Sequence, residues 1–295
     1  MKVFFYTGFA LTAFAFNSIL CRLALGTQAI DAASFTAVRL ISGAFALVLI
    51  SFFYAGKETK KEAEKGAEKE AEKKRGNWIS AFFLFAYAIC FSFAYTNLAT
   101  GTGALILFGS VQMTMIITAV VSGERPKITE WLGLIFALGG LIYLVFPGLS
   151  SPPFFSSMLM TLAGISWGFY TLRGRGSKTP LADTTGNFLR SVPMIVLITL
   201  PFLPQIHLSQ KGILLAVLSG AIASGIGYSV WYHALKFHTA TRAAIVQLSV
   251  PALAAFGGVI FLAEIVSTRL VLATILILGG ITIAIAGRKY GKNKV

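Results

Sequence analysis

The chain of 295 residues has little charge and little cysteine. Only 12% of its residues are charged while 56% are hydrophobic, and its mean hydropathy is +0.77. Soluble globular domains carry about twice this share of charged residues, so lipid rather than water is expected to surround most of the chain. The two cysteines, Cys21 and Cys90, each lie alone in an apolar run. This placement argues against a disulfide framework.

Two familiar enzyme motifs and the usual spacings of metal ligands are missing as well. The sequence contains no HExxH and no phosphate-binding GxxxxGK[ST], and no cysteine or histidine cluster with the spacing of metal ligands. The three histidines, His207, His233 and His238, are dispersed near the expected ends of helices. We therefore expect no enzyme activity, no cofactor and no bound metal.

The net charge of +14 could indicate a nucleic-acid partner, but the position of the charge argues otherwise. Lysine and arginine lie in short segments between apolar runs and at the C-terminus, which is typical of membrane topology. The expected partners are the lipid bilayer and a small-molecule solute, with no nucleic acid. The sequence indicates no oligomeric state.

Apolar runs of membrane-spanning length follow one another along the chain. A helix needs about 20 apolar residues to cross a bilayer, and backbone polar groups in lipid must pair within the segment, which favours helices over open sheets. The predicted fold class is an all-α polytopic membrane protein. Its ten transmembrane helices are expected at residues 3–25, 32–54, 78–98, 102–122, 128–147, 154–173, 183–203, 212–235, 240–262 and 268–287.

The distribution of positive charge predicts the orientation of these helices. With the N-terminus inside, twenty lysines and arginines fall in cytoplasmic segments, against three on the other side, namely Arg22, Lys211 and Arg269. Cytoplasmic loops of membrane proteins carry such an excess. Both termini are therefore expected in the cytoplasm, and the protein is expected to span the cytoplasmic, or inner, membrane several times.

The two halves of the chain repeat one pattern. Glu124 precedes Gly139-Gly140 by fifteen residues, and Glu264 precedes Gly279-Gly280 by the same distance. Two further matches pair Tyr95-x-x-Leu98 with Tyr232-x-x-Leu235 and Asp31…Arg39 with Asp183…Arg190. Because each half has five predicted spans, an odd number, the second copy enters the membrane in the opposite direction. Inverted repeats of this kind are typical of secondary transporters, although channels contain them too.

The predicted domains follow from the duplication. The first five-helix repeat covers residues 1–147 and the inverted second repeat covers 154–287, followed by a basic cytoplasmic tail at 288–295. Residues 57–75 alternate lysine and glutamate at helical spacing and have no counterpart in the second half. This segment is expected to be a solvated cytoplasmic linker, with contact to anionic lipid or a partner as the alternative.

Two arginines occupy matching positions in the halves. Arg39 and Arg190 each follow, after about two helical turns, an aspartate that can cap the start of the span, Asp31 or Asp183. An arginine at that depth must extend to the interface, pair with carbonyls or bind an anion. The symmetry favours a structural role, and capture of an anionic substrate is the alternative.

Proline and small residues suggest where the helices bend. Pro193 and Pro251 interrupt two spans, and a proline removes one hydrogen bond of the helix, so both are hinge candidates. The span at 212–235 carries Gly220-x-x-x-Ser224 and two similar pairs of small residues. Small residues four apart let helices approach each other closely.

Together these motifs resemble the EamA-like ten-helix carriers of the drug/metabolite transporter superfamily. Besides the repeated blocks, the matching residues are Arg39-Leu40-x-Ser42-Gly43, Ser249-Val250-Pro251 and Ser166-Trp167-Gly168-x-Tyr170. The resemblance covers the whole chain except the linker, and it implies a central cavity between the repeats. Buried polar and aromatic residues are then the candidates for its lining: Asn17, Tyr95, Gln112, Trp167, Tyr228 and Gln247.

The alternative for the glutamines is a structural role in hydrogen bonding between helices. The alternative for the aromatic residues is a position in the belt at the membrane–water interface. The function that we expect is export of small organic metabolites, such as amino acids, by alternating access around a cavity at the membrane midplane. An aromatic and amide-lined cavity suits zwitterionic or amphipathic solutes. The rival interpretation is a membrane sensor or lipid-binding scaffold that transports nothing.

Overall fold

The computed structural model describes residues 2–62, 76–121, 128–146, 151–174, 177, 179–235, 237, 246–247 and 249–292. Within these ranges the secondary structure is helical, apart from one isolated β-bridge between Ile30 and Leu208. The predictions for Glu124, for residues 63–75 of the linker, for the start of the ninth span at 240–245 and for the end of the tail at 293–295 lie outside the described residues.

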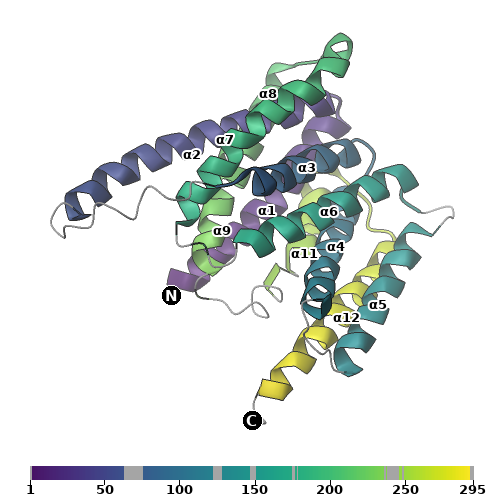
Figure 1. Cartoon of the computed structure of the whole chain (residues 1–295). Helices are drawn as coiled ribbons and strands as arrows, with labels where there is room; N and C mark the ends of the chain where they lie inside the picture. Colours follow the sequence, from purple (N-terminus) through teal and green to yellow (C-terminus); the bar gives the residue numbers. More distant parts are fainter. Residues whose placement is uncertain are drawn as a thin grey trace.

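Five helices form the first half of the chain (Figure 1), and they follow the predicted spans closely. They are α1 (Lys2–Gly26), α2 (Ala32–Glu62), α3 (Trp78–Tyr95), α4 (Thr100–Val121) and α5 (Ile128–Val145). Helix α2 runs past the predicted end of its span, so residues 57–62 of the charged linker are helical.

The second half is less regular. It contains α6 (Phe154–Gly174), α7 (Pro180–Thr199), the 3₁₀ helix η1 (Leu200–Gln205), α8 (Gln210–Val217), the π-helix η2 (Leu218–Ile226), α9 (Gly227–Leu235), α11 (Ser249–Leu262) and α12 (Thr268–Lys292). The seventh predicted span ends earlier than expected, at Thr199, because Pro201 and Pro204 cannot donate the hydrogen bonds of an α-helix. The eighth predicted span runs continuously through α8, η2 and α9.

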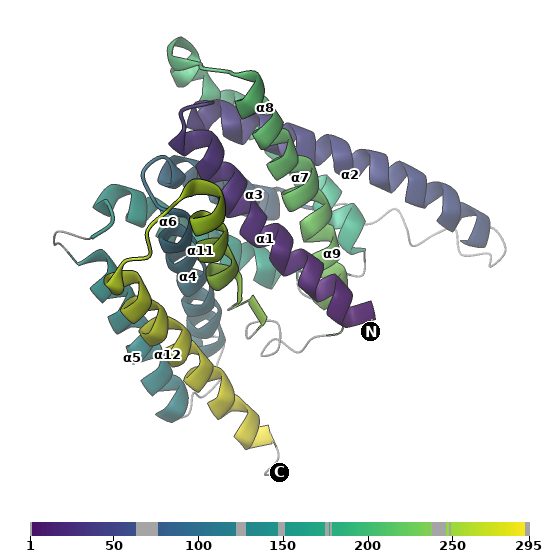
Figure 2. The same ribbon diagram turned by 180° about the vertical axis from the view of Figure 1, so that it is seen from behind.

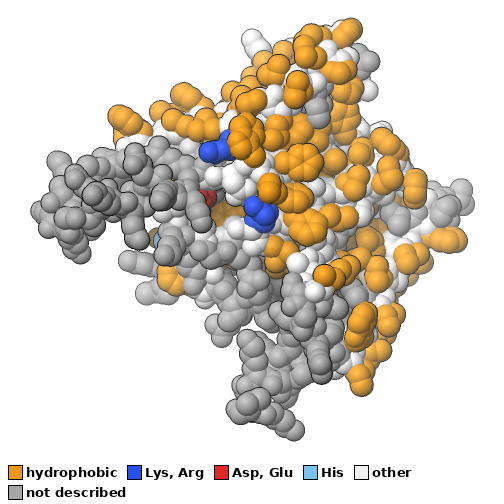
Figure 3. Space-filling view, viewed as in Figure 1, with side chains coloured by type: hydrophobic (Ala, Val, Ile, Leu, Met, Phe, Trp, Pro, Cys, Tyr) orange, Lys and Arg blue, Asp and Glu red, His pale blue; other side chains and the backbone are white. Residues whose placement is uncertain are grey.

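The outer surface of the molecule is apolar. Phe4, Phe52 and Leu197 are 87%, 75% and 72% exposed, and hydrophobic side chains cover most of the described surface on the face in Figure 3. Among the described residues, five helical stretches are long and apolar enough to cross a membrane, and three further apolar helices are shorter. The five are Val3–Gly26, Ala32–Phe53, Trp78–Tyr95, Thr100–Thr118 and Gln210–Leu235. These features are those of a polytopic membrane protein.

Helices from the two halves interleave. Helix α3 packs on α6, α1 packs on the α8–η2–α9 segment, α2 on α7, α4 on α11 and α5 on α12. The α5–α12 pair lies side by side in both ribbon views (Figures 1 and 2). The N-terminal end of α1 and the C-terminal end of α12 point to the same side of the molecule (Figure 1). The core therefore lies between the halves, and neither half is packed by itself.

The repeated Gly-Gly pairs mark the crossing of α5 and α12. A Cβ atom on Gly140 would lie 2.8 Å from Leu276 Cβ, and one on Gly280 would lie 2.6 Å from the Gly133 carbonyl oxygen. By contrast, a Cβ atom on Gly139 or Gly279 would meet nothing within 4 Å. The second glycine of each pair thus lets the two helices approach closely.

Glu264, which begins the second repeated block, caps another helix. Its carboxylate accepts hydrogen bonds from the Thr100 amide at 2.8 and 3.0 Å, at the start of α4. Arg22 lies beside it, with Nε 3.5 Å from Glu264 Oε1, and donates to the Tyr95 and Thr96 carbonyls at the end of α3. A carboxylate is favourable at a helix N-terminus and a cation at a C-terminus. The pair therefore joins α1, α3 and α4 to the segment before α12.

Asp31 ties the first loop to the second half of the chain. Its carboxylate accepts hydrogen bonds from the Ser34 amide at 2.8 Å, which caps α2, and from the His207 amide at 3.0 Å. Burial would raise the pKa of Asp31, but these hydrogen bonds outweigh it and hold the pKa below its ordinary value. The ionised carboxylate is thus the form that the folded protein favours.

The glycine pair at the α5–α12 crossing gives a matched test. Gly140→Ala should lower the free energy of unfolding by about 1–3 kcal/mol, because the added methyl group must displace α12. Gly139→Ala should be neutral or slightly stabilising, because it meets no neighbour and alanine favours helix. Thermal unfolding in detergent measures both. Equal effects of the two changes would contradict the close crossing.

The Asp31 carboxylate predicts a pH-dependent contribution to stability. Because its pKa is lowered in the folded state, the contribution is present above the ordinary pKa of about 3.9 and is lost as the pH falls below it. Asp31→Asn should cost about 1 kcal/mol at neutral pH, since the amide cannot accept both hydrogen bonds. The difference in Tm from the wild type should shrink at low pH. A difference that does not change with pH would contradict this assignment.

Candidate functional site

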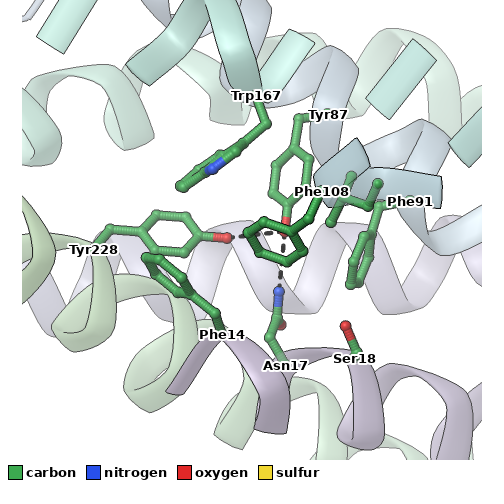
Figure 4. Close-up of a pocket in the computed structure, with 9 residues that line it drawn as sticks. Phe14, Asn17, Ser18, Tyr87, Phe91, Phe108, Trp167 and Tyr228 are labelled. Carbon is green, nitrogen blue, oxygen red and sulfur yellow. Dashed lines mark hydrogen bonds between the residues drawn. The ribbon is translucent and has the colours of Figure 1, made fainter. Parts of the chain in front are cut away.

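A small pocket lies among α1, α3, α4, α6 and α9 (Figure 4). Its volume is about 10 Å³, roughly the space that one water molecule needs. It is therefore closed to any metabolite in this conformation. Aromatic and small polar side chains line it: Phe14, Asn17, Ser18, Tyr87, Phe91, Leu107, Phe108, Trp167 and Tyr228.

Three polar side chains from different helices meet at the pocket. Asn17 Nδ2 on α1 donates to Tyr87 Oη on α3 at 3.1 Å, and Tyr228 Oη on α9 donates to the same oxygen at 3.2 Å (Figure 4). The Ser219 hydroxyl donates to Asn17 Oδ1 at 2.5 Å, which orients the amide. This network joins the first half of the chain to the second through hydrogen bonds in the interior.

A buried arginine lies directly behind the two tyrosines. Arg39 on α2 is 1% exposed. Its Nη2 donates to Tyr87 Oη at 3.2 Å and to Tyr228 Oη at 3.0 Å, and its Nε donates to Ser224 Oγ at 3.1 Å. Its Cζ also lies 4.9 Å from the centre of the Phe91 ring. All of these partners are neutral, and within the described ranges no carboxylate lies within ion-pair distance of the guanidinium.

The π-helix η2 supplies both serines of this cluster. Ser219 and Ser224 are five residues apart, and in a helix with i→i+5 hydrogen bonds such residues lie near one another on one face, unlike in an α-helix. A Cβ atom on Gly220 would collide with the Arg39 carbonyl oxygen and the Ser42 hydroxyl. The wider turn and the missing side chain therefore let η2 approach the backbone of α2 beside Arg39.

Aromatic rings form the rest of the pocket wall. The Trp167 ring centre lies 4.6 Å from that of Tyr228 and 4.9 Å from that of Tyr87. Phe14 contacts Trp167 and Tyr228 edge-on, at 5.8 and 5.7 Å. Such contacts add to the stability gained from burial. In this state the rings fill the space between the helices.

The structure gathers three of the six predicted cavity residues, Asn17, Trp167 and Tyr228, at one pocket. Tyr95 is buried at the end of α3, where its hydroxyl donates to the Thr100 carbonyl at 3.2 Å. Gln112 and Gln247 are buried as well. These last three are not among the residues that line the described pocket, so their role at a solute site remains a prediction.

The second arginine and the two hinge candidates lie in different environments. Arg190 is half-buried and donates to the Gly186 carbonyl of its own helix at 2.9 Å, so the two arginines of the repeat have different environments. Pro193 lies inside α7. Pro251 is buried near the start of α11. The hinge assignments remain predictions.

Sequence reasoning missed Tyr87 and the aromatic residues around it. Tyr87, Phe91 and Tyr95 recur every four residues on α3, and this stripe was the available signal for one buried aromatic face. Within the stripe, Phe91 contacts both neighbours, with ring centres 5.3 and 4.7 Å away. Nothing in the sequence distinguishes the member that carries the central hydroxyl, because that depends on the position of Arg39.

A sequence pattern that is typical of hydrolases has a packing role in this protein. Gly164 to Gly168 match the GxSxG pattern of hydrolase nucleophiles, but they lie inside α6 and not in a turn between a strand and a helix. A Cβ atom on Gly164 would lie 2.5 Å from the Leu107 carbonyl oxygen, and one on Gly168 would lie 3.0 Å from Thr114. These glycines therefore allow α6 to pack closely on α4.

Known proteins resemble this chain over two thirds or more of its length. The model of the EamA-like transporter family matches it twice, at residues 2–146 and 154–286. An uncharacterized protein of Pseudomonas aeruginosa is 47% identical over 96% of this chain and 94% of its own. An uncharacterized transporter of Archaeoglobus fulgidus is 26% identical over 68% of this chain and 74% of its own. A crystal structure with 18% identity shares the fold, with a TM-score of 0.65 over 96% of this chain and 98% of that one.

The contact between η2 and α2 can be tested with two glycines. Gly220→Ala should destabilise the protein by about 1–3 kcal/mol, because the methyl group would collide with the α2 backbone beside Arg39. Gly8→Ala on α1 is the control, since a Cβ atom there would meet nothing within 4 Å. Thermal unfolding in detergent measures both. A Gly220→Ala variant as stable as the control would contradict the close approach.

Proposed function

The chain belongs to the EamA-like transporter family, and we propose that it exports small organic metabolites, such as amino acids, by alternating access at the pocket of Asn17, Tyr87, Trp167 and Tyr228. The observation that carries this proposal is a buried polar cluster, shared by both halves, inside a protein with an apolar exterior. Polar groups are costly within a membrane and mark solute pathways there. The proposal thus places the transported solute between the two halves.

The packing supports two repeats of inverted orientation. The α3–α6 contact has its counterpart in the contact of α1 with the α8–η2–α9 segment, and α2–α7, α4–α11 and α5–α12 pair matching helices. Two loops make matching contacts as well. Asp31 accepts a hydrogen bond of 3.0 Å from the His207 amide, before α8, and Asp183 accepts one of 3.1 Å from the Gly76 amide, before α3. A two-fold axis in the membrane plane would exchange such contacts. Two conformations related by that exchange would open one site to each side in turn.

The closed pocket fits the middle of such a cycle. Its volume of about 10 Å³ excludes a metabolite, so binding requires that the helices around it separate. The contacts that shut it are aromatic rings and neutral hydrogen bonds, which can separate at modest cost. Gln112 and Gln247 are buried on α4 and just before α11, and we propose that they line the opened cavity.

Topology and localisation follow from the charge pattern. The ends of α1 and α12 point to one side of the molecule (Figure 1), as the predicted even number of crossings requires. We propose that this side is cytoplasmic because twenty of the 25 lysines and arginines fall in segments predicted to lie on it. The membrane would then be the cytoplasmic, or inner, membrane.

Counterflow in proteoliposomes tests the proposal. Vesicles preloaded with unlabelled amino acids and related metabolites should accumulate a labelled trace of at least one class. Trp167→Ala should lower that exchange about tenfold, because it removes the indole ring that contacts Phe14, Tyr87 and Tyr228 in the pocket wall. Phe155→Ala on the same helix, a position 64% exposed, is the control and should exchange normally.

The outcomes separate the interpretations. Equal exchange by Trp167→Ala and Phe155→Ala would move the transport site away from this pocket. No exchange of any metabolite, by protein with a sharp thermal transition, would overturn transport of small organic metabolites. Net uptake of the solute by right-side-out vesicles, with no net release from preloaded ones, would contradict the proposed direction.

A further inference from the structure

The guanidinium group of Arg39 is a buried positive charge, and no carboxylate among the described residues lies close enough to balance it. Every hydrogen-bond partner that it has is a hydroxyl group, and its Nη1 has no hydrogen-bond partner among the described residues. An arginine in a protein remains charged. A buried charge without a counter-ion is costly, and such a charge in a membrane protein is commonly part of a binding site.

The polar cluster around Arg39 has too many donors. Tyr87 Oη receives hydrogen bonds from Arg39 Nη2, Asn17 Nδ2 and Tyr228 Oη. A phenol oxygen has two lone pairs, so one oxygen faces three donors. The Asn17 carbonyl, the acceptor next to it, already receives the Ser219 hydroxyl. A group with several strong acceptor atoms is what this cluster needs.

We propose that the transported solute carries a carboxylate and that Arg39 binds it together with the hydroxyls of Tyr87 and Tyr228. This inference rests on the proposed function and names the solute class for the same site. A carboxylate supplies two acceptor oxygens in the plane that matches a guanidinium, and it balances the charge. In the closed state the two tyrosine hydroxyls, 3.2 and 3.0 Å from Nη2, occupy acceptor positions that the solute takes on binding.

The surroundings also define the rest of the solute. Both tyrosines line the pocket together with Phe14, Phe91 and Trp167. Arg39 therefore lies directly behind the pocket wall, hydrogen-bonded to its two tyrosines, and the rest of the pocket is mainly aromatic. A small carboxylate with an apolar body places its charge at Arg39 and its body against the rings. A polyol or an inorganic cation finds no such match.

The test compares solutes that differ only in the carboxylate. Wild-type proteoliposomes are given leucine against leucinamide, phenylalanine against phenylalaninamide, and 3-phenylpropanoate against 3-phenylpropanol, each as an unlabelled competitor and as a labelled tracer. Loss of a charged hydrogen-bonding partner weakens binding by roughly tenfold or more. We expect the carboxylate member of any pair that is exchanged to exceed its partner by that factor.

Substitutions at Arg39 add a second, independent measurement. Arg39→Gln should remove the preference for the carboxylate, bringing the exchange of acid and amide within a few-fold of each other, and Arg39→Lys should retain part of it. Arg269→Gln is the matched control. Arg269, at the start of α12, donates to the Phe146 carbonyl at 2.7 Å and lies over the Tyr143 ring, and neither it nor these partners line the pocket. Size-exclusion profiles and Tm values check folding. If Arg39→Gln does not fold, the selectivity of the wild type decides.

Each result has a defined meaning. Preference for the carboxylate in the wild type, and its loss in Arg39→Gln, supports the inference. Equal or better exchange of the amide or alcohol by the wild type overturns it while the proposed transport function stands. An Arg39→Gln variant that folds and keeps the full preference overturns the role of Arg39. If none of the six probes and no metabolite of the wider panel is exchanged, the proposed function and this inference are both overturned.

Discussion

The need to hold the positively charged Arg39 inside an apolar protein shapes the centre of this molecule. Water cannot solvate the guanidinium there, so neighbouring helices must supply its partners. Ser224, Tyr87 and Tyr228 do so from η2, α3 and α9. Because these elements come from both halves of the chain, a single side chain on α2 couples the two repeats. The π-helix and the close contact at Gly220 follow from the same need, since both bring η2 to the backbone of α2.

Outside this centre, small and capping residues are among the contacts that join the halves. The second glycine of each Gly-Gly pair, Gly140 and Gly280, sets the approach of α5 to α12. Glu264 and Asp31 cap helices and at the same time bind segments distant in sequence. These contacts are local and polar, or depend on small residues, and contacts of this kind can re-form at matching places in the other repeat. The aromatic rings around the pocket are the contacts that a solute is proposed to separate.

Much of the fold could be predicted from the sequence. The lengths of the apolar runs and the charged residues between them predict where the helices lie, because a membrane leaves few alternatives to a helix of about 20 residues. Asn17, Trp167 and Tyr228 stood out as polar or amphipathic residues in apolar runs. The π-helix could not be predicted, because its wider turn depends on contact with α2. The unequal roles of Arg39 and Arg190 also escaped the sequence, since the repeat assigns them the same place and only their neighbours differ.

Alternating access, as we propose it, opens one site between the halves to each side of the membrane in turn. Labelling of a Ser18→Cys variant, with Cys21 and Cys90 replaced by serine or alanine, tests it directly. A membrane-impermeant maleimide is added to right-side-out and to inside-out vesicles, with and without saturating solute. Alternating access predicts labelling of the Ser18→Cys variant from both sides, with solute protecting the position from each. Labelling from one side only, or from neither in protein that exchanges solute, would contradict it.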